Sequence, residues 1–173
     1  MKHFAIIGSP VGQSLSPLLH NWVFKALNIQ AEYKKIRVEE EELPDIIQQI
    51  RNGKLDGCNV TIPYKENIMK YLDEINPRAK SISSVNCIMK SNSKIIGNNT
   101  DWFGFTMALK ENKIDLSNKE VIVLGAGDTA KSILFSLKQL GANKIILLNR
   151  TLHKAEALKD DIITPYSMEN TES

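Results

Sequence analysis

Residues 120–150 limit most strongly what this chain can fold into. Two apolar runs, Glu120–Leu124 and 144–148, flank a stretch with helical spacing over 129–140. The first run ends in a Gly-Ala-Gly turn that begins at Gly125. A strand, a glycine turn, a helix and a second strand form a crossover unit, in which the two strands are parallel. The segment therefore predicts a parallel sheet covered by helices.

The rest of the chain repeats this alternation of strands and helices. Further strands are expected over 3–7, 31–38, 57–62, 84–89 and 94–96. Further helices are expected over 17–27, 39–51, 64–71, 101–111 and 151–159. The segment 112–118 is polar and resembles a linker, so a domain boundary is expected between about residues 100 and 118. The fold class predicted is α/β, with largely parallel sheets.

Composition excludes several classes of protein. An apolar fraction of 42% and a charged fraction of 24% are ordinary for a folded protein. No stretch approaches the roughly 18 apolar residues of a membrane span, and no secretion signal is recognised, so a cytoplasmic location is expected. With 22 basic and 20 acidic residues, the net charge of +2 does not favour nucleic acid or a membrane surface as a partner. The separation of Cys58 and Cys87 suits neither a disulfide framework nor a metal site.

The glycine turn carries the pattern G-x-G-x-x-A, directly after a strand and at the start of a helix. Glycines allow a tight turn and a close approach of the backbone, and a helix N-terminus attracts a pyrophosphate. In this context the pattern predicts dinucleotide binding, with an ordinary βα turn as the alternative. The candidate cofactor-binding residues are Gly125, Ala126, Gly127, Asp128 and Thr129.

The end of the next strand distinguishes between two cofactors. An NAD site usually has an acidic residue here, which binds the ribose 2′-hydroxyl. This chain instead has Asn149, Arg150 and Thr151, followed by Lys154. The guanidinium and ammonium groups suit a 2′-phosphate, so the prediction is NADP rather than NAD. The alternative is a solvated, charged helix start.

A third group of polar residues lies in the first half of the chain. Ser14 and Ser16 lie at a helix entry with Ser16 as the expected N-cap, and such hydroxyls can bind a carboxylate or phosphate. Asn59 and Thr61 share one face of a predicted strand. Lys65 falls in the first turn of the next predicted helix, where the dipole favours loss of its proton. Taken singly, an ordinary cap and a surface lysine are the simpler interpretations.

These motifs occur together in one order, and together they resemble the shikimate dehydrogenase family. The resemblance extends from residue 4 to about residue 168. Its most specific parts are Asn-Val-Thr-Ile-Pro-Tyr-Lys-Glu from Asn59 and Gly-Asn-Asn-Thr-Asp-x-x-Gly from Gly97. Ser-x-Ser-Pro from Ser14, Ser-Val-Asn ending at Asn86, Gly-Ala-Gly and Asn-Arg-Thr complete the set.

The resemblance implies NADPH-dependent reduction of 3-dehydroshikimate to shikimate in aromatic amino acid (chorismate) biosynthesis, with no metal. It implies that Lys65 donates and accepts the proton, with Asp101 as its partner. The substrate-binding residues that it implies are Ser14 and Ser16 at the carboxylate, Thr61 and Asn86 at the ring hydroxyls, and Asn59 as a support. Cys58 and Cys87 are expected to face away from the two asparagines.

The resemblance also implies a domain organisation. A substrate-binding catalytic domain is expected over 1–101, a connecting helix and linker over 102–118, and an incomplete Rossmann-type NADP-binding domain over 119–173. Family chains are longer by about a hundred residues. We therefore expect little or no turnover from the 173 residues alone, with a partner or a C-terminal extension completing the fold. The alternatives are a quinate/shikimate dehydrogenase and a non-catalytic shikimate-binding fragment; the oligomeric state stays open.

Overall fold

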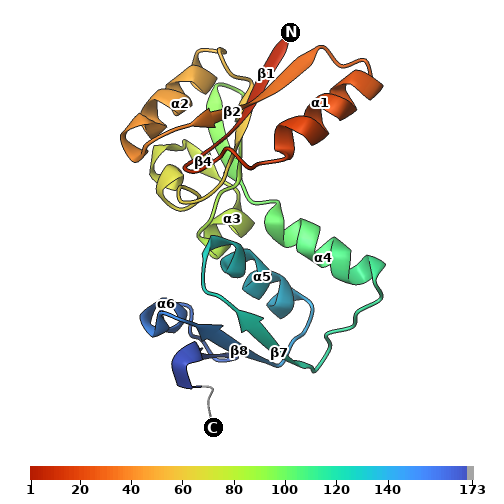
Figure 1. Ribbon diagram of the computed structural model, residues 1–173, viewed down its shortest axis with the longest axis vertical. Helices are drawn as coiled ribbons and strands as arrows, with labels where there is room; N and C mark the ends of the chain where they lie inside the picture. The colour runs from red at the N-terminus through yellow and green to blue at the C-terminus, as the bar shows by residue number, and fades with distance from the viewer. Residues whose placement is uncertain (171–173) are drawn as a thin grey trace. The chain divides into compact units, whose positions relative to one another are not determined.

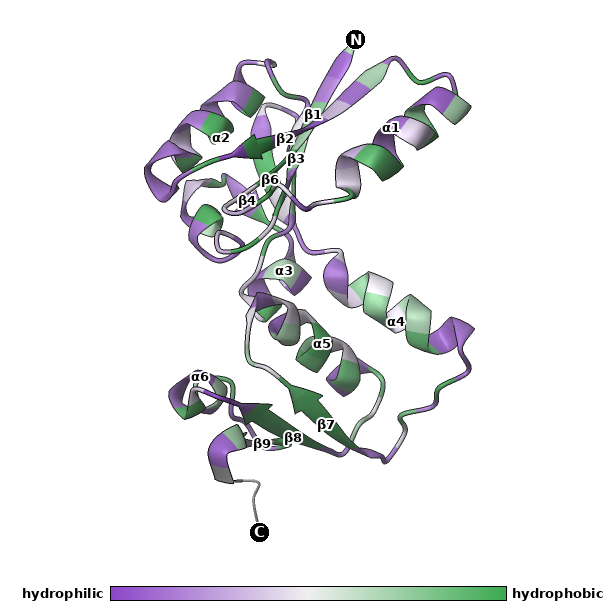
Figure 2. Cartoon of the chain, in the orientation of Figure 1, coloured by the Kyte–Doolittle hydropathy of each residue, from purple (hydrophilic) through white to green (hydrophobic). Residues whose placement is uncertain are grey.

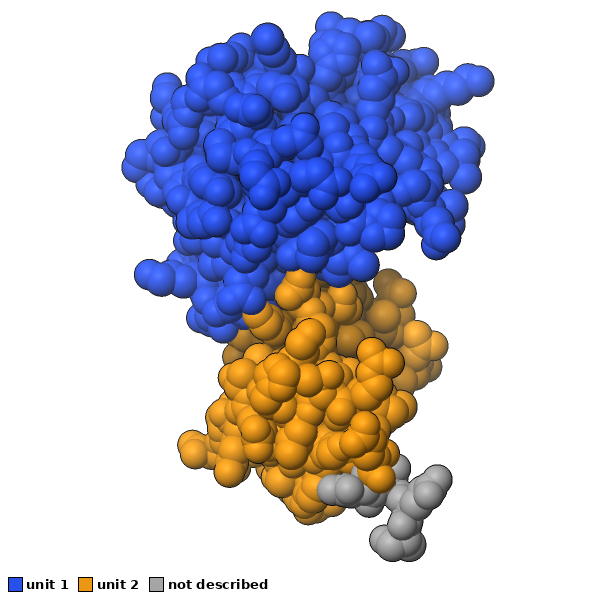
Figure 3. Space-filling model, turned by 60° about the vertical axis from the view of Figure 1, so that its left-hand side comes forward, with its two compact units in different colours: residues 1–99 blue, residues 100–173 orange. Residues whose placement is uncertain are grey.

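The computed structural model describes residues 1–170, which fall into two compact units (Figure 1; Figure 3). Unit 1 comprises residues 1–99, and unit 2 begins at Thr100. Each unit has its own sheet and its own hydrophobic core. Among the described helices, none combines the length and apolar character needed to span a bilayer.

The sheet of unit 1 is mixed. Its strand order is β2-β1-β3-β5-β6-β4. The first three strands are parallel, β5 runs antiparallel to both β3 and β6, and β4 is parallel to β6. The bounds are β1 Lys2–Gly8, β2 Ala31–Arg37, β3 Gly57–Val60, β4 Glu74–Ile75, β5 Cys87–Ser91 and β6 Lys94–Asn98.

The helices of unit 1 bury different amounts of apolar surface. Helix α2 buries Leu43, Ile46, Ile47 and Ile50, which supply much of the core. Helix α1 has no buried residue, and apolar side chains that share one of its faces, Leu18 and Trp22, are exposed, with Trp22 70% accessible. The bounds are α1 Ser16–Ala26, η1 Glu40–Glu42, α2 Leu43–Arg51, η2 Asn67–Tyr71 and α3 Pro77–Ile82, where η denotes a 3₁₀ helix.

Unit 2 contains a parallel sheet in the order β7-β8-β9. The central strand β8 is the most buried, with Ile145 and Leu147 fully inaccessible, and β7 and β8 are strongly hydrophobic (Figure 2). This parallel β–α–β arrangement confirms the predicted α/β class. The bounds are α4 Asp101–Glu111, β7 Glu120–Leu124, α5 Asp128–Gln139, β8 Lys144–Asn149, α6 Leu152–Glu156, β9 Ile163–Ser167 and η3 Met168–Asn170.

The segment 64–71 differs from the predicted helix. Lys65 lies in a turn, and only the 3₁₀ helix η2 follows it. The physical reason is that the Lys65 carbonyl accepts a hydrogen bond from the Val85 N–H, at 2.8 Å. The Met69 N–H donates to the backbone carbonyl of Glu66, at 3.1 Å, which is the spacing of a 3₁₀ helix. A tertiary partner thus takes the acceptor that an α-helix would use. The helix dipole argument for Lys65 therefore does not apply.

Candidate functional site

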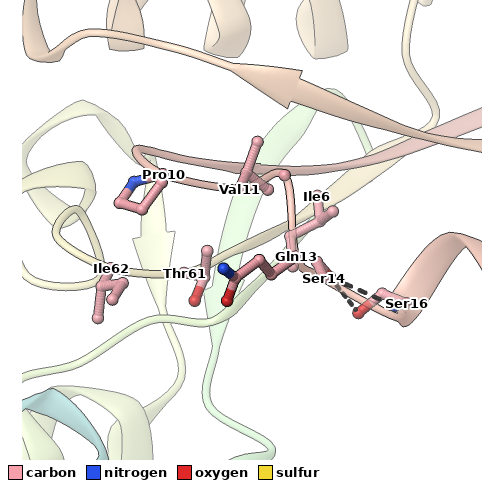
Figure 4. Close-up of a pocket in the computed structure, with 9 residues that line it drawn as sticks. Ile6, Pro10, Val11, Gln13, Ser14, Ser16, Thr61 and Ile62 are labelled. Carbon is pink, nitrogen blue, oxygen red and sulfur yellow. Dashed lines mark hydrogen bonds between the residues drawn. The ribbon is translucent and has the colours of Figure 1, made fainter.

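A pocket of about 500 Å³ lies in unit 1, beside the loop after β1 and the end of β3 (Figure 4). It brings together Ser14, Ser16 and Thr61 from distant parts of the sequence. Its other lining residues are Ile6, Pro10, Val11, Gly12, Gln13 and Ile62. The pocket is therefore a mainly apolar hollow with hydroxyl groups on its wall, and Gln13 is a polar lining residue that the sequence reasoning missed.

The two serines are coupled to each other at the start of α1. The Ser14 hydroxyl lies 3.2 Å from the Ser16 hydroxyl and accepts from the Ser16 N–H at 3.3 Å (Figure 4). Ser16 is the first residue of α1, and the N-cap position belongs to Leu15, so the expected N-cap role of Ser16 is wrong. The Ser14 hydroxyl, rather than that of Ser16, accepts a hydrogen bond from a backbone N–H at the start of the helix. Both hydroxyls nevertheless lie at the positive end of an 11-residue helix, which favours an anion.

Thr61 is held by the crossing of two backbone segments. The Thr61 N–H donates to the backbone carbonyl of Ile7 at 2.9 Å, and the Ser9 N–H donates to the backbone carbonyl of Ile62 at 3.1 Å. At Gly8, an added Cβ would lie 2.5 Å from Cγ2 of Thr61 and 2.9 Å from the Ile62 oxygen. Only glycine allows this close approach. The glycine that ends β1 thus lets the threonine reach the pocket.

Asn59 and Asn86 are linked to each other, and neither is among the residues that line the pocket. The Asn59 side-chain NH₂ donates to the Asn86 carbonyl at 3.0 Å, and the Tyr33 hydroxyl donates to Oδ1 of Asn59 at 2.6 Å. The Asn86 carbonyl also accepts from the Val60 N–H at 3.0 Å. Asn86 itself is buried. These bonds are consistent with a supporting role for Asn59.

The two cysteines occupy different faces of the sheet. Cys58 is buried in the main core, and burial raises the pKa of its thiol to about 12. Cys87 is the register partner of Asn59 in the antiparallel β3–β5 pair. Because directly paired residues project to the same side, Cys87 shares the face of Asn59, contrary to the expectation. Burial raises the pKa of Cys87 as well.

Lys65 and Asp101 belong to different units. Lys65 is only 6% exposed and lies in the turn between β3 and η2. Asp101 is the first residue of α4, after the N-cap Thr100. Their pairing stays a prediction from the resemblance.

A second pocket, of about 450 Å³, lies in unit 2 at the carboxyl ends of the strands. It gathers six of the predicted cofactor-binding residues and one other, Met168. The six are Ala126, Gly127, Asn149, Arg150, Thr151 and Lys154. Gly125, Asp128 and Thr129 are not among its lining residues; Gly125 forms the turn with a φ of +100°, and the other two begin α5.

The donors and the shape of this pocket fit a dinucleotide phosphate. Arg150 and Lys154 provide two positive side chains among the lining residues. A Cβ added at Gly127 would meet no atom within 4 Å, so the space above the turn is open to a ligand. The turn leads into the 12-residue helix α5, whose N-terminus favours a pyrophosphate. Within residues 1–170, no cluster of His, Cys, Asp or Glu could hold a metal ion.

Met168 is a lining residue that the sequence reasoning missed. It follows β9, which was not predicted as a strand. Its neighbours in the pocket, Gly127 and Asn149, lie near the ends of the parallel strands β7 and β8. Recognition of 163–167 as a third parallel strand would have placed Met168 at the same edge.

Two units with a pocket each, one of them at the glycine turn of a parallel β–α–β arrangement, are typical of the class of dinucleotide-binding dehydrogenases. Residues 6–88 match the family model described as the shikimate dehydrogenase substrate binding domain. Residues 106–172 match the model described as shikimate / quinate 5-dehydrogenase. The chain belongs to the shikimate dehydrogenase family.

Curated relatives agree with this assignment. The chain is 43% identical over 158 residues to shikimate dehydrogenase (NADP(+)) of Pelagibacter ubique, covering 91% of this chain and 60% of the relative. It is 41% identical over 169 residues to the enzyme of the same name from Staphylococcus haemolyticus, covering 98% and 63%. The chain thus spans less than two thirds of the length of these relatives.

Solved structures show the same correspondence. The shikimate dehydrogenase 1 structure from Peptoclostridium difficile matches with a TM-score of 0.85 at 36% identity, covering 98% of this chain and 61% of that one. The Thermus thermophilus enzyme in complex with NADP(H) and shikimate matches with a TM-score of 0.83 at 34% identity, covering 91% and 59%.

Proposed function

We propose that this chain carries the substrate pocket and the NADP pocket of an enzyme that reduces 3-dehydroshikimate to shikimate with NADPH. The observation that carries the proposal is the gathering of Ser14, Ser16 and Thr61 in one pocket of a chain whose curated relatives are shikimate dehydrogenases (NADP(+)). Residues 1–101 form the substrate-binding part, 102–118 connect, and 119–173 form part of the NADP-binding domain. The free thiols of Cys58 and Cys87 suit the reducing cytoplasm.

The substrate carboxylate binds at Ser14 and Ser16. Their hydroxyls lie 3.2 Å apart, so one carboxylate can accept from both. The positive end of α1 adds to this attraction. Thr61 and Asn86 face the ring hydroxyls, because a hydroxyl or an amide can both donate and accept.

Lys65 supplies the proton. NADPH, when bound, supplies the hydride. Negative charge then develops on the carbonyl oxygen of the substrate, where an ammonium group stabilises it and transfers a proton from Nζ. Burial of Lys65 to 6% exposure strengthens such an interaction, since less water screens it. Asp101 is the partner that we assign to Lys65 in this proton transfer.

Arg150 and Lys154 select NADP over NAD. A guanidinium binds a phosphate in bidentate geometry, and an ammonium adds a point charge. Asn149 positions the glycine turn, since its amide bonds the Ala126 N–H and the Thr151 carbonyl.

Absorbance of NADPH in the presence of 3-dehydroshikimate tests the proposal. We expect little turnover from the 173-residue chain and clear turnover from a chimera that adds the C-terminal part of the Staphylococcus haemolyticus relative. In the chimera, Lys65→Ala should lower kcat by orders of magnitude with a modest change in KM. Lys80→Ala, at an exposed lysine of the same unit, is the control. A chimera that binds shikimate but oxidises no NADPH would establish a non-catalytic binding module instead.

A further inference from the structure

We propose that Tyr33 is a positioning residue of the substrate pocket, whose hydroxyl fixes the amide of Asn59 and, through it, the end of β3 that leads to the lining residue Thr61. The inference rests on the proposed function, because it assigns Tyr33 a role in shikimate binding. Tyr33 lies on β2, outside every motif that the sequence reasoning used.

The first argument is the geometry of the Asn59 amide. Its NH₂ donates to the Asn86 carbonyl, at 3.0 Å, and a carbonyl can only accept. Oδ1 therefore faces the Tyr33 hydroxyl, which donates to it at 2.6 Å. Both ends of the amide are engaged, so its orientation is fixed. Asn59 in turn lies two residues before Thr61, which follows the end of β3 and lines the pocket.

The second argument is the way in which Tyr33 itself is held. His20 stacks on its ring, with the ring centres 4.3 Å apart and the planes 5° from parallel. Asn21 binds the Tyr33 backbone on both sides: the Asn21 NH₂ donates to the Tyr33 carbonyl and Oδ1 accepts from its N–H, both at 2.9 Å. Tyr33 is only 4% exposed. A phenol held at its ring and at its backbone is well suited to orient another side chain.

The third argument is the connection between the two walls of the pocket. His20 and Asn21 lie on α1, the helix that begins at Ser16. Asn59 lies on β3, which leads to Thr61. Tyr33 thus links α1, which begins at Ser16, to β3, which leads to Thr61. Burial, with smaller effects from Cys58 and Cys87, raises the pKa of Tyr33 far above its usual range, so the phenol stays a neutral donor.

A double-mutant cycle on shikimate affinity tests this role. Tyr33→Phe keeps the ring on His20 but removes the hydroxyl, which leaves Oδ1 of Asn59 without its donor. We expect the Kd for shikimate, measured by calorimetry on the full chain, to rise about tenfold. In the Asn59→Ala background the same change should alter the Kd less than about twofold, because the group it acts through is absent.

Tyr64→Phe is the matched control. The Tyr64 hydroxyl is also buried and donates to a carbonyl of unit 1, that of Val38, at 2.9 Å. Tyr64→Phe should lower the melting temperature about as much as Tyr33→Phe does, but it should leave the Kd for shikimate unchanged. The proposal is overturned if Tyr33→Phe binds shikimate as tightly as the wild type, or if it weakens binding equally in both backgrounds. A wild-type chain that binds no shikimate overturns the proposed function and this role together.

Discussion

The backbone N–H of Ala126 donates to Oδ1 of Asn149 at 3.1 Å, which joins the glycine turn after β7 to the end of β8. The NH₂ of the same amide donates to the Thr151 carbonyl at 2.7 Å. One side chain therefore holds the turn that faces the cofactor pocket and the segment that carries Arg150.

Replacement of Asn149 should weaken cofactor binding through the turn. Asn149→Ala removes the acceptor of the Ala126 N–H, and it leaves the Thr151 carbonyl with only the Lys154 N–H, at 3.1 Å. The turn therefore loses the side chain that ties it to the end of β8. We expect the Kd for NADP⁺, measured by calorimetric titration, to rise about tenfold. Asn143→Ala, at the exposed residue just before β8, should leave it unchanged. Equal affinities for Asn149→Ala and the wild type would show that the turn holds its shape without this amide.

Arg150 should determine the preference for NADP over NAD. Arg150→Ala removes a charge-assisted bond to the 2′-phosphate, and NAD lacks that phosphate. The Kd for NADP⁺ should therefore rise about ten- to a hundredfold, while that for NAD⁺ changes little. The control is Lys159→Ala, at an exposed cation that does not line the pocket. A parallel loss of affinity for both cofactors would contradict a 2′-phosphate contact.

Local patterns predicted unit 2 better than they predicted α1. The glycine turn and two strong apolar runs define β7 and β8, because both strands follow from neighbouring residues, although β9 of the same unit was not predicted. In α1, the helical spacing of Leu18 and Trp22 is typical of a face that packs on a sheet, but both side chains are exposed. Phe24 packs toward the small core of Ile6, Val11 and Tyr33 instead. Helical period alone does not determine which side meets a sheet.

The contrast between a buried residue of α2 and an exposed residue of α1 can be measured as a difference in the free energy of unfolding. Ile50 is fully buried in α2, so Ile50→Ala should lower the free energy of unfolding by about 2–5 kcal/mol. Trp22→Ala, at a residue 70% exposed, should change it by less than about 0.5 kcal/mol. Urea unfolding followed by circular dichroism gives both values. A loss at Trp22 as large as that at Ile50 would mean that α1 is packed in solution.

Asp73 should make unit 1 less stable in acid. The Arg51 guanidinium donates to the Asp73 carboxylate at 3.0 Å, and the Ile95 N–H donates to the same carboxylate at 2.7 Å. These two bonds hold the pKa of Asp73 below its usual value. A lowered native pKa stabilises the fold above the unfolded value, about 3.9, and this stabilisation disappears as the pH falls through the native pKa.

The variant Asp73→Asn tests that sign. At pH 7 it should unfold at a lower urea concentration than the wild type, and the difference should shrink as the pH falls below about 4. A difference that stays constant down to pH 2 would assign the effect to packing rather than to the charge of Asp73.

In the candidate site, too, some residues could be predicted from the sequence and others could not. Ser14, Ser16 and Thr61 were predicted from motifs, and one pocket contains all three. Tyr33 could not be predicted in this way, because its contact with Asn59 spans 26 residues and depends on the register of β2, β1 and β3. Motifs identify groups that are close in sequence, whereas a positioning residue depends on tertiary packing.

The most direct test of the account is a titration of the ¹⁵N-labelled chain with shikimate and, separately, with NADP⁺, followed by two-dimensional NMR. Shikimate should shift the backbone signals of Ser14, Ser16 and Thr61, which line the pocket of unit 1. NADP⁺ should shift those of Ala126, Gly127 and Arg150 in unit 2. Saturating shifts confined to these two sets are the predicted result. Spectra unchanged by either ligand, or shifts centred on other residues, would contradict it.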